Sequence, residues 1–246
     1  MQTHLLILGG TTEATALAHH IAKTDFKAII SYAGRVERIR PQPIEKRIGG
    51  FGGSDGLARY IRDNQISHVI DATHPFAAQM SHNAVEACLQ TGTPLAALTR
   101  PAWIRKSGDK WHHVPDINGA VQALDRLAQT PRRIMLAIGR MHIDQFTCQP
   151  DHFYLLRLVD APDETPNFPD YALEVSRGPF TFEVDKALLE QHQIDLVVSK
   201  NAGGKGAYAK IEAARALGLE VIMIDRPALP DRTELHSSEA VMSWLA

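Results

Sequence analysis

Short apolar runs alternate with amphipathic stretches along the whole chain, a pattern typical of α/β proteins. The apolar run Leu5–Leu8 comes first, and a helical pattern follows from Thr12 to Lys23. Apolar runs of this length predict strands that are covered on both faces, as in a parallel sheet. The other elements expected in this half are strands at Lys27–Ser31, Glu45–Ile48, His68–Asp71 and Pro94–Leu98, and helices at Leu57–Asn64 and Ala77–Gln90.

A second series of strands and helices follows a segment with little periodicity at residues 99–110, which contains Pro101 and Gly108. We therefore predict an α/β protein of two Rossmann-like parallel-sheet domains, residues 1–100 and 101–246, with a cleft between them. The strands expected in the second domain are Arg133–Ile138, Phe153–Val159, Leu196–Ser199 and Val221–Ile224. Its expected helices are Ile117–Gln129, Phe182–Gln191, Tyr208–Leu217 and Glu239–Leu245.

Composition narrows the class of protein. The 246 residues carry 26 Lys and Arg against 28 Asp and Glu, so the chain lacks the positive excess typical of nucleic-acid binders. Cys88 and Cys148 have no partner at metal-site or redox-motif spacing, which favours a reducing, cytoplasmic environment and no metal site. No apolar run approaches the roughly 18 residues of a membrane span, and the chain starts without a basic leader.

The loop after the first strand is suited to holding a phosphate. Its residues Gly9, Gly10, Thr11, Thr12 and Glu13 lie between a strand and a helix, where free backbone N–H groups and the helix dipole attract anions. The loop matches G-x-G-x-x-G/A imperfectly, because Thr11 replaces the middle glycine. Either threonine hydroxyl could bind phosphate, and Thr12 could instead cap the helix.

The end of the second expected strand favours NADP over NAD. An NAD site usually has an acidic residue about 20 residues after the glycine loop, to hold the ribose hydroxyls. This chain has Arg35 there, and a guanidinium suits a 2′-phosphate; an ordinary surface arginine is the alternative. Gly52 and Gly53, in the glycine-rich run 49–53, permit close approach of a cofactor but also fit an ordinary flexible turn.

Polar residues follow the fourth expected strand, where ligands of open α/β sheets bind. Asp71, Thr73 and His74 could orient a ribose, a nicotinamide or a substrate carbonyl, and His74 could exchange a proton near neutral pH. Helix capping is an equally good explanation of Asp71.

Cations recur where the other strands end. Their clustering predicts a ligand with several carboxylates or phosphates, although the whole chain is slightly acidic. The residues are Arg100, Arg140, Arg177, Lys200 and Arg226.

Taken in order, six motifs resemble the precorrin-6A reductases of cobalamin biosynthesis, including the cobalt-precorrin-6A enzymes, over nearly the whole chain. The motifs are Leu8–Ala14, Asp71–Ala77, Arg100–Trp103, Ser176–Phe180, Ser199–Gly204 and Ala209–Arg215. The resemblance implies NADPH on the first domain and a tetrapyrrole-derived substrate in the cleft. It also implies that hydride reduces one carbon–carbon double bond while a proton adds to the adjacent carbon.

On this basis we expect Thr73 and His74 to position the nicotinamide and substrate, with His74 or a water delivering the proton. Arg100, Arg140, Arg177, Lys200 and Asn201 are the expected substrate-binding residues. Two alternatives stay open: an NADP-dependent reductase of a small carbonyl compound, whose Tyr/Lys acid pair we do not find, and a non-catalytic NADP-sensing module.

Overall fold

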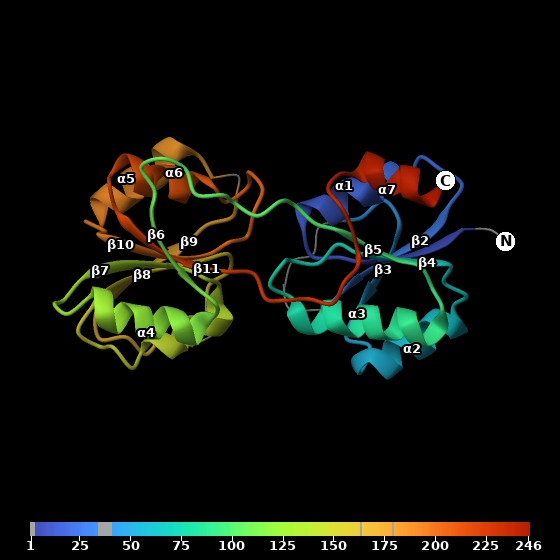
Figure 1. Cartoon of the computed structure of the whole chain (residues 1–246), viewed down its shortest axis with the longest axis horizontal. Helices are drawn as coiled ribbons and strands as arrows, with labels where there is room; N and C mark the ends of the chain where they lie inside the picture. Colours follow the sequence, from blue (N-terminus) through green and yellow to red (C-terminus); the bar gives the residue numbers. More distant parts are fainter. Residues whose placement is uncertain (1–2, 34–40, 163, 179) are drawn as a thin grey trace. The chain divides into compact units, whose positions relative to one another are not determined.

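The computed structural model describes residues 3–33, 41–162, 164–178 and 180–246. Arg35, the predicted 2′-phosphate ligand, lies outside the described residues. The chain forms two compact units, the first made of Met1–Pro101 and Ala228–Ala246 and the second of Ala102–Pro227 (Figure 1). The expected division at residue 100 therefore needs a correction, because the last 19 residues, 228–246, return to the first unit.

The first unit contains a six-stranded sheet in the order β12-β5-β4-β1-β2-β3, in which every neighbouring pair is parallel. Its strands are β1 (His4–Leu8), β2 (Lys27–Tyr32), β3 (Glu45–Ile48), β4 (His68–Asp71), β5 (Leu95–Leu98) and β12 (Thr233–Leu235). Its helices are α1 (Thr12–Ile21), α2 (Gly53–Asp63), α3 (Ala78–Thr91) and α7 (Ser238–Leu245).

Helices cover both faces of this sheet, α1 and α7 on one and α2 and α3 on the other (Figure 1). Alternate residues of β1 point to opposite faces: Leu5 and Ile7 pack in the core beneath α1 and α7, and Leu6 and Leu8 in the core beneath α2 and α3. Burial on both faces explains why β1 is apolar from Leu5 to Leu8.

The second unit has its own six-stranded parallel sheet, in the order β6-β11-β10-β7-β8-β9. Its strands are β6 (Lys110–Val114), β7 (Arg133–Ala137), β8 (Phe153–Leu158), β9 (Tyr171–Val175), β10 (Leu196–Lys200) and β11 (Glu220–Ile224). Its helices are α4 (Ile117–Leu127), the 3₁₀ helix η1 (Arg140–Phe146), α5 (Phe182–Gln191) and α6 (Ala209–Ala216). Helices α5 and α6 cover one face of the sheet and α4 the other (Figure 1).

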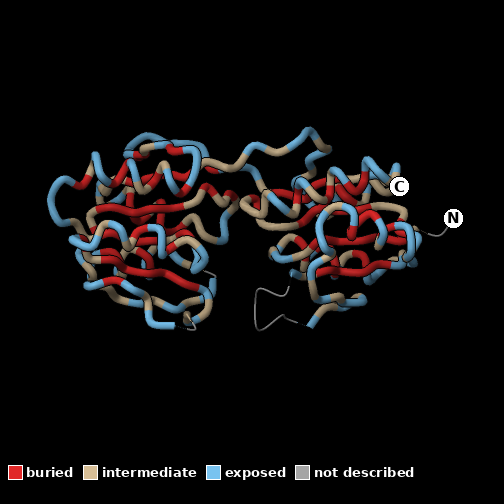
Figure 2. Tube along the Cα trace, turned by 90° about the horizontal axis from the view of Figure 1, so that it is seen from below, coloured by how far each residue is buried: buried red, intermediate tan, exposed pale blue. Residues whose placement is uncertain are grey.

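The two-unit parallel architecture confirms the predicted fold class. In each unit the buried residues run along the strands, and exposed residues lie on the helices and loops around them (Figure 2). Strands β6, β9 and β12 were not predicted, and all of them are edge strands. Within the described part of the chain, no helix has the length and apolar character needed to cross a membrane.

Candidate functional site

Two loops meet at the carboxyl edge of the first sheet, where the strand order reverses direction. Strands β2 and β3 lie on one side of β1, and β4 and β5 lie on the other. The loops after β1 and β4 therefore flank a topological switch point, the usual ligand position in open parallel sheets. A hydrogen bond of 2.8 Å from Thr11 Oγ1 to the carbonyl of Ala72 joins them.

The loop after β1 is shaped for close approach by an anionic group. A side chain at Gly9 would collide with Ile30, 2.9 Å away, so this position must stay glycine for the loop to pack against β2. Gly10 has φ +133°, and no atom lies within 4 Å of the place its Cβ would occupy. Backbone N–H groups at the start of α1 are thus accessible beside open space, as phosphate binding requires.

Thr11, rather than Thr12, caps helix α1. The Thr11 hydroxyl accepts a hydrogen bond from the Ala14 backbone N–H at 3.1 Å, and Ala14 is fully buried against the sheet. The predicted capping by Thr12 is wrong, because Thr12 is the first residue of the helix and is exposed. Its hydroxyl instead donates to Glu13 Oε2 at 3.1 Å.

Asp71 organises the loop after β4. Its carboxylate is buried and accepts hydrogen bonds from the Thr73 N–H at 3.1 Å and the Thr73 hydroxyl at 2.6 Å. Ser81 and Arg232 donate to its other oxygen, each at 2.6 Å. Asp71 therefore fixes the conformation of the loop. Because the Thr73 hydroxyl donates its proton to Asp71, its oxygen lone pairs can accept a hydrogen bond from a ligand.

His74 lies on the same loop in a partly exposed position. Its Nδ1 accepts a hydrogen bond from the Phe76 backbone N–H at 3.2 Å, so the neutral ring carries its proton on Nε2. The Phe76 ring lies 5.9 Å from the His74 ring between centroids. The loop thus gives His74 a defined tautomer and a defined ring position.

The glycine-rich run after β3 lies farther along the same edge, because β2 separates β3 from β1. Gly52 and Gly53 adopt φ of +82° and +85°, and Gly52 is the N-cap position of α2. Arg47 holds this run through bonds to the carbonyls of Gly49 at 2.5 Å and Gly50 at 2.8 Å. Arg47 also donates to Ser31 Oγ at 3.1 Å, which links the run to the end of β2.

Arg100 follows β5 and pairs with another predicted ligand. Its guanidinium lies 3.4 Å from Glu13 Oε1, and the two side chains are 18% and 29% exposed. The pair ties the first turn of α1 to the end of β5. Because both groups stay partly exposed, Arg100 keeps a donor surface toward solvent.

In the second unit, Lys200 is the last residue of β10, and the segment that begins with Arg140 follows the neighbouring strand β7. This is the switch point of the second sheet, since β8 and β9 lie on one side of β7 and β10 and β11 on the other. Burial lowers the pKa of Lys200 to about 8. The pKa of His142 is also lowered, first by burial and then by the charge of Lys200.

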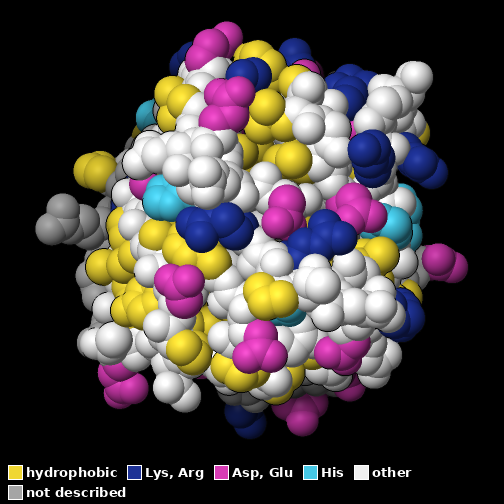
Figure 3. Space-filling model, turned by 90° about the vertical axis from the view of Figure 1, so that its left-hand side faces the viewer, with side chains coloured by type: hydrophobic (Ala, Val, Ile, Leu, Met, Phe, Trp, Pro, Cys, Tyr) yellow, Lys and Arg dark blue, Asp and Glu magenta, His cyan; other side chains and the backbone are white. Residues whose placement is uncertain are grey.

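Arg177 follows the edge strand β9 and forms an ion pair with Asp160, which follows β8. The face of the second unit drawn in Figure 3 likewise shows Lys and Arg side chains next to Asp and Glu side chains. Two of the five strand-end cations, Arg100 and Arg177, therefore have a carboxylate partner.

Asn201 has a different role from the one predicted. It is buried, its Oδ1 accepts from the Trp103 N–H at 2.8 Å, and its Nδ2 donates to the Trp103 carbonyl at 3.0 Å. We therefore assign Asn201 to holding the segment around Trp103 rather than to binding a carboxylate. Arg226 donates to the carbonyls of Asn201 and Ala202 and so braces the same loop.

Sequence reasoning missed Arg232 and Arg47, since neither lies in a recognisable motif. Arg232 reaches Asp71 from a position 161 residues later in the chain. Among the described residues, no group of three or more His, Cys, Asp or Glu side chains is arranged to hold a metal ion.

Comparison with known proteins identifies the family. A family model described as Precorrin-6x reductase CbiJ/CobK matches residues 4–246. The chain is 54% identical over 244 residues to a precorrin-6A reductase of Rhodobacter capsulatus, covering 99% of this chain and 96% of that protein. A cobalt-precorrin-6A reductase of Priestia megaterium is 27% identical over 253 residues, covering 98% and 97%. A solved structure of a CobK precorrin-6A reductase matches with a TM-score of 0.93 at 54% identity, covering 99% of this chain and 96% of that chain. The chain belongs to the precorrin-6x reductase CbiJ/CobK family.

Proposed function

We propose that the protein is an NADPH-dependent reductase that acts on precorrin-6A or cobalt-precorrin-6A. Hydride adds to one carbon of a carbon–carbon double bond, and a proton adds to the adjacent carbon, giving the dihydro product. Family membership supports the reaction class. The proposed cofactor site is supported by one observation: the Thr11–Ala72 hydrogen bond joins two loops at the switch point of the first sheet.

The first unit fits a dinucleotide. Gly10, Thr11 and Thr12 offer backbone N–H groups and hydroxyls at the start of α1 for the pyrophosphate. Neither the last residues of β2, Ser31 and Tyr32, nor Ala33 is acidic, which removes the usual NAD ribose ligand, and Arg35 is the proposed ligand for a 2′-phosphate. Glu13, Gly9, Gly52 and Gly53 complete the proposed cofactor-binding set.

NADPH, when bound, supplies the hydride. The chain's own contribution is positioning: the Thr73 hydroxyl, held by Asp71, can accept a hydrogen bond from the nicotinamide carboxamide. His74, in its imidazolium form, is the proposed proton donor through Nε2–H, with a water as the alternative. Arg100, Arg140, Arg177 and Lys200 are the proposed ligands for substrate carboxylates, because guanidinium and ammonium groups form charge-assisted hydrogen bonds with them.

The cofactor assignment is tested by replacing Arg35 with Ala. We expect the KM for NADPH to rise much more than the KM for NADH, since only NADPH carries the 2′-phosphate. Equal changes in the two constants would refute the role of Arg35.

The proposed proton donor is tested by replacing His74 with Ala. His74→Ala should lower kcat while the Kd of NADPH stays the same; near-normal turnover would refute that role.

A further inference from the structure

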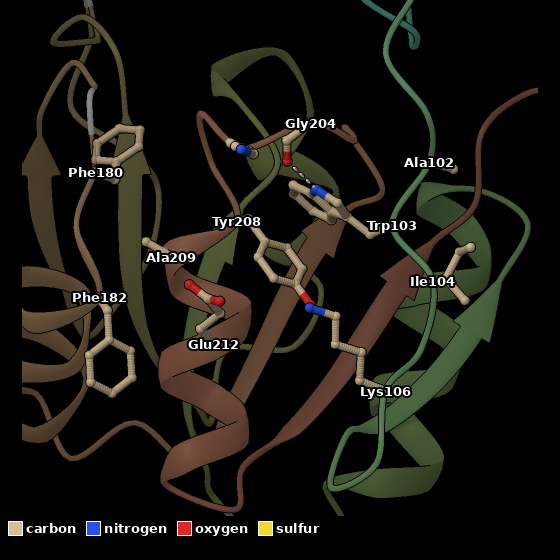
Figure 4. A pocket seen from close by; sticks show the side chains of 11 residues that line it. Ala102, Trp103, Ile104, Lys106, Phe180, Phe182, Gly204, Tyr208, Ala209 and Glu212 are labelled. Atoms are coloured by element: carbon tan, nitrogen blue, oxygen red, sulfur yellow. Dashed lines mark hydrogen bonds between the residues drawn. The ribbon is translucent and has the colours of Figure 1, made fainter.

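The second unit contains an aromatic pocket of about 720 Å³ that none of the strand-end residues lines (Figure 4). This volume lies within the range of small-molecule sites. We call it the Tyr208 pocket. Its walls come from the segment before β6, the start of α5 and the start of α6, and the side chains that matter here are Trp103, Ile104, Lys106, Phe180, Phe182 and Tyr208.

The Trp103 wall is held firmly in place. The Asn201 side chain bonds both backbone groups of Trp103, and the indole N–H donates to the Gly204 carbonyl at 2.6 Å. The Lys210 ammonium lies 5.1 Å from the centre of the Trp103 ring. Trp103 itself is only 8% exposed, so it forms a rigid base for the pocket.

Tyr208 is the residue before α6, and its ring lies beside Trp103, with 5.4 Å between the ring centres (Figure 4). Its hydroxyl accepts a hydrogen bond from Arg215 Nη2 at 2.7 Å, and Arg215 is fixed by Asp109, whose side chain is 1% exposed. A buried carboxylate therefore positions a partly exposed aromatic ring through an arginine. Such bracing keeps the ring plane fixed, which lowers the entropy cost of stacking a flat ligand on it.

The rim of the pocket combines apolar exposure with positive charge. Ile104 is 80% exposed and adds apolar surface to the rim. Lys106 places its ammonium 5.0 Å from the centre of the Tyr208 ring. Lys205 also lines the pocket and is exposed, and the one acidic lining residue is Glu212. The pocket thus suits a flat conjugated ligand with carboxylate substituents.

We propose that the Tyr208 pocket binds one edge of the substrate macrocycle, with a conjugated ring stacked on Tyr208 and a carboxylate side chain at Lys106. This inference rests on the proposed function for the identity of the substrate. It adds a binding surface that differs from the cations at the strand ends. A nucleotide base would also stack on aromatic rings, so the experiment has to separate the two ligands.

The test measures binding without turnover. We expect Tyr208→Leu to raise the Kd of precorrin-6A by about tenfold or more in isothermal titration, the size expected for loss of one stacking contact. The Kd of NADPH should stay the same. Tyr171→Leu is the matched control, because Tyr171 lies on the edge strand β9 and packs against Phe168 outside the pocket.

A second pair of variants tests the charge and avoids the core. Lys106→Glu should weaken precorrin-6A binding, and the difference from wild type should shrink at high salt. Lys23→Glu, an equal change of charge at an exposed position of the first unit, should leave binding unchanged.

The outcomes separate the pocket from the proposed function. Wild-type protein that binds precorrin-6A at the pocket but does not oxidise NADPH would refute the function and leave the pocket standing. Unchanged precorrin-6A binding in both Tyr208→Leu and Lys106→Glu would refute the pocket. Variants that bind NADPH more weakly but precorrin-6A as tightly as wild type would refute it as well. Wild-type protein that neither binds nor reduces precorrin-6A would refute both.

Discussion

At the scale of single residues, the loop that carries Thr73 and His74 depends on Asp71 and its buried partners. Asp71 is 3% exposed, and the side chains of the Arg232–Asp71 ion pair are 7% and 2% exposed. A carboxylate in such a place needs its compensating charge and donors, because leaving it unpaired is costly. The sequence predicts that Asp71 orients a ligand or caps a helix, because nothing local indicates its partner Arg232, 161 residues later in the chain.

Replacing Arg232 with Ala should lower the free energy of unfolding by roughly 3–5 kcal/mol, the cost of leaving a buried charge unpaired. It should also weaken NADPH binding, because Thr73 loses its fixed position. Urea denaturation and NADPH titration measure the two effects. Glu234→Ala is the control: Glu234 lies 3.5 Å from the same guanidinium but is 49% exposed, so its loss should cost less than about 0.5 kcal/mol.

Lys200 gives a prediction for pH. Its pKa is lowered to about 8 by burial, so the folded protein loses this positive charge as the pH rises through 8. If the ammonium binds a substrate carboxylate, the KM for precorrin-6A should rise above about pH 8. In Lys200→Arg the cation persists at these pH values, and the rise should disappear. Identical KM profiles for the two proteins between pH 7 and 9.5 would contradict the role.

At the scale of elements, the strands that the sequence predicts are chiefly those buried on both faces. Central strands such as β1 and β10 contain continuous apolar runs, Leu5–Leu8 and Leu196–Val198, because helices cover both sides of them. Edge strands are less buried: β9 has no fully buried residue, and β12 is exposed or half-buried throughout. Their residues therefore lack an apolar run, and only their pairing with a neighbouring strand reveals them.

Some parts of the candidate site could likewise be predicted from the sequence, and others could not. The loops after β1 and β4 could be located from sequence, because the βα rhythm fixes where a strand ends. The role of Asn201 could not, since its bonds go to Trp103, 98 residues earlier in the chain. Contacts over such distances depend on the tertiary fold and leave no local pattern.

The Thr11 side chain couples two elements, because it both caps α1 and joins the loops after β1 and β4. Thr11→Ala should lower the free energy of unfolding by about 1 kcal/mol for the lost cap and weaken NADPH binding. Thr11→Ser keeps the hydroxyl and should restore both properties. Urea denaturation and titration with NADPH provide the measurements; an alanine variant with wild-type affinity would refute the proposed coupling of the loops.

At the scale of the whole molecule, the two units share one strand order. In each, a central strand has its two successors on one side and the next two on the other, β1 to β5 in the first sheet and β7 to β11 in the second. The sixth strand differs in origin: β12 comes from the end of the chain, whereas β6 precedes β7. The first unit is therefore complete only when the chain has returned from the second.

Deletion of residues 228–246 should consequently damage the first unit selectively. The deletion removes β12, Arg232 and the α7 residue Val241, which is fully buried in the core beneath α1. Hydrogen exchange should show lost protection in β1 and β4, with protection retained in β10. Wild-type protection of β1 in the shortened chain would show that the C-terminal segment is dispensable.

Reduction of the tetrapyrrole by hydride from NADPH can be followed with a labelled cofactor. The protein is incubated with precorrin-6A and, separately, its cobalt form, using NADPH deuterated at the transferable C4 position. Mass spectrometry should show a product that has gained one deuterium from the cofactor and one hydrogen from solvent. Reduction of neither substrate, or a reduced product without deuterium, would contradict hydride transfer from NADPH to the tetrapyrrole.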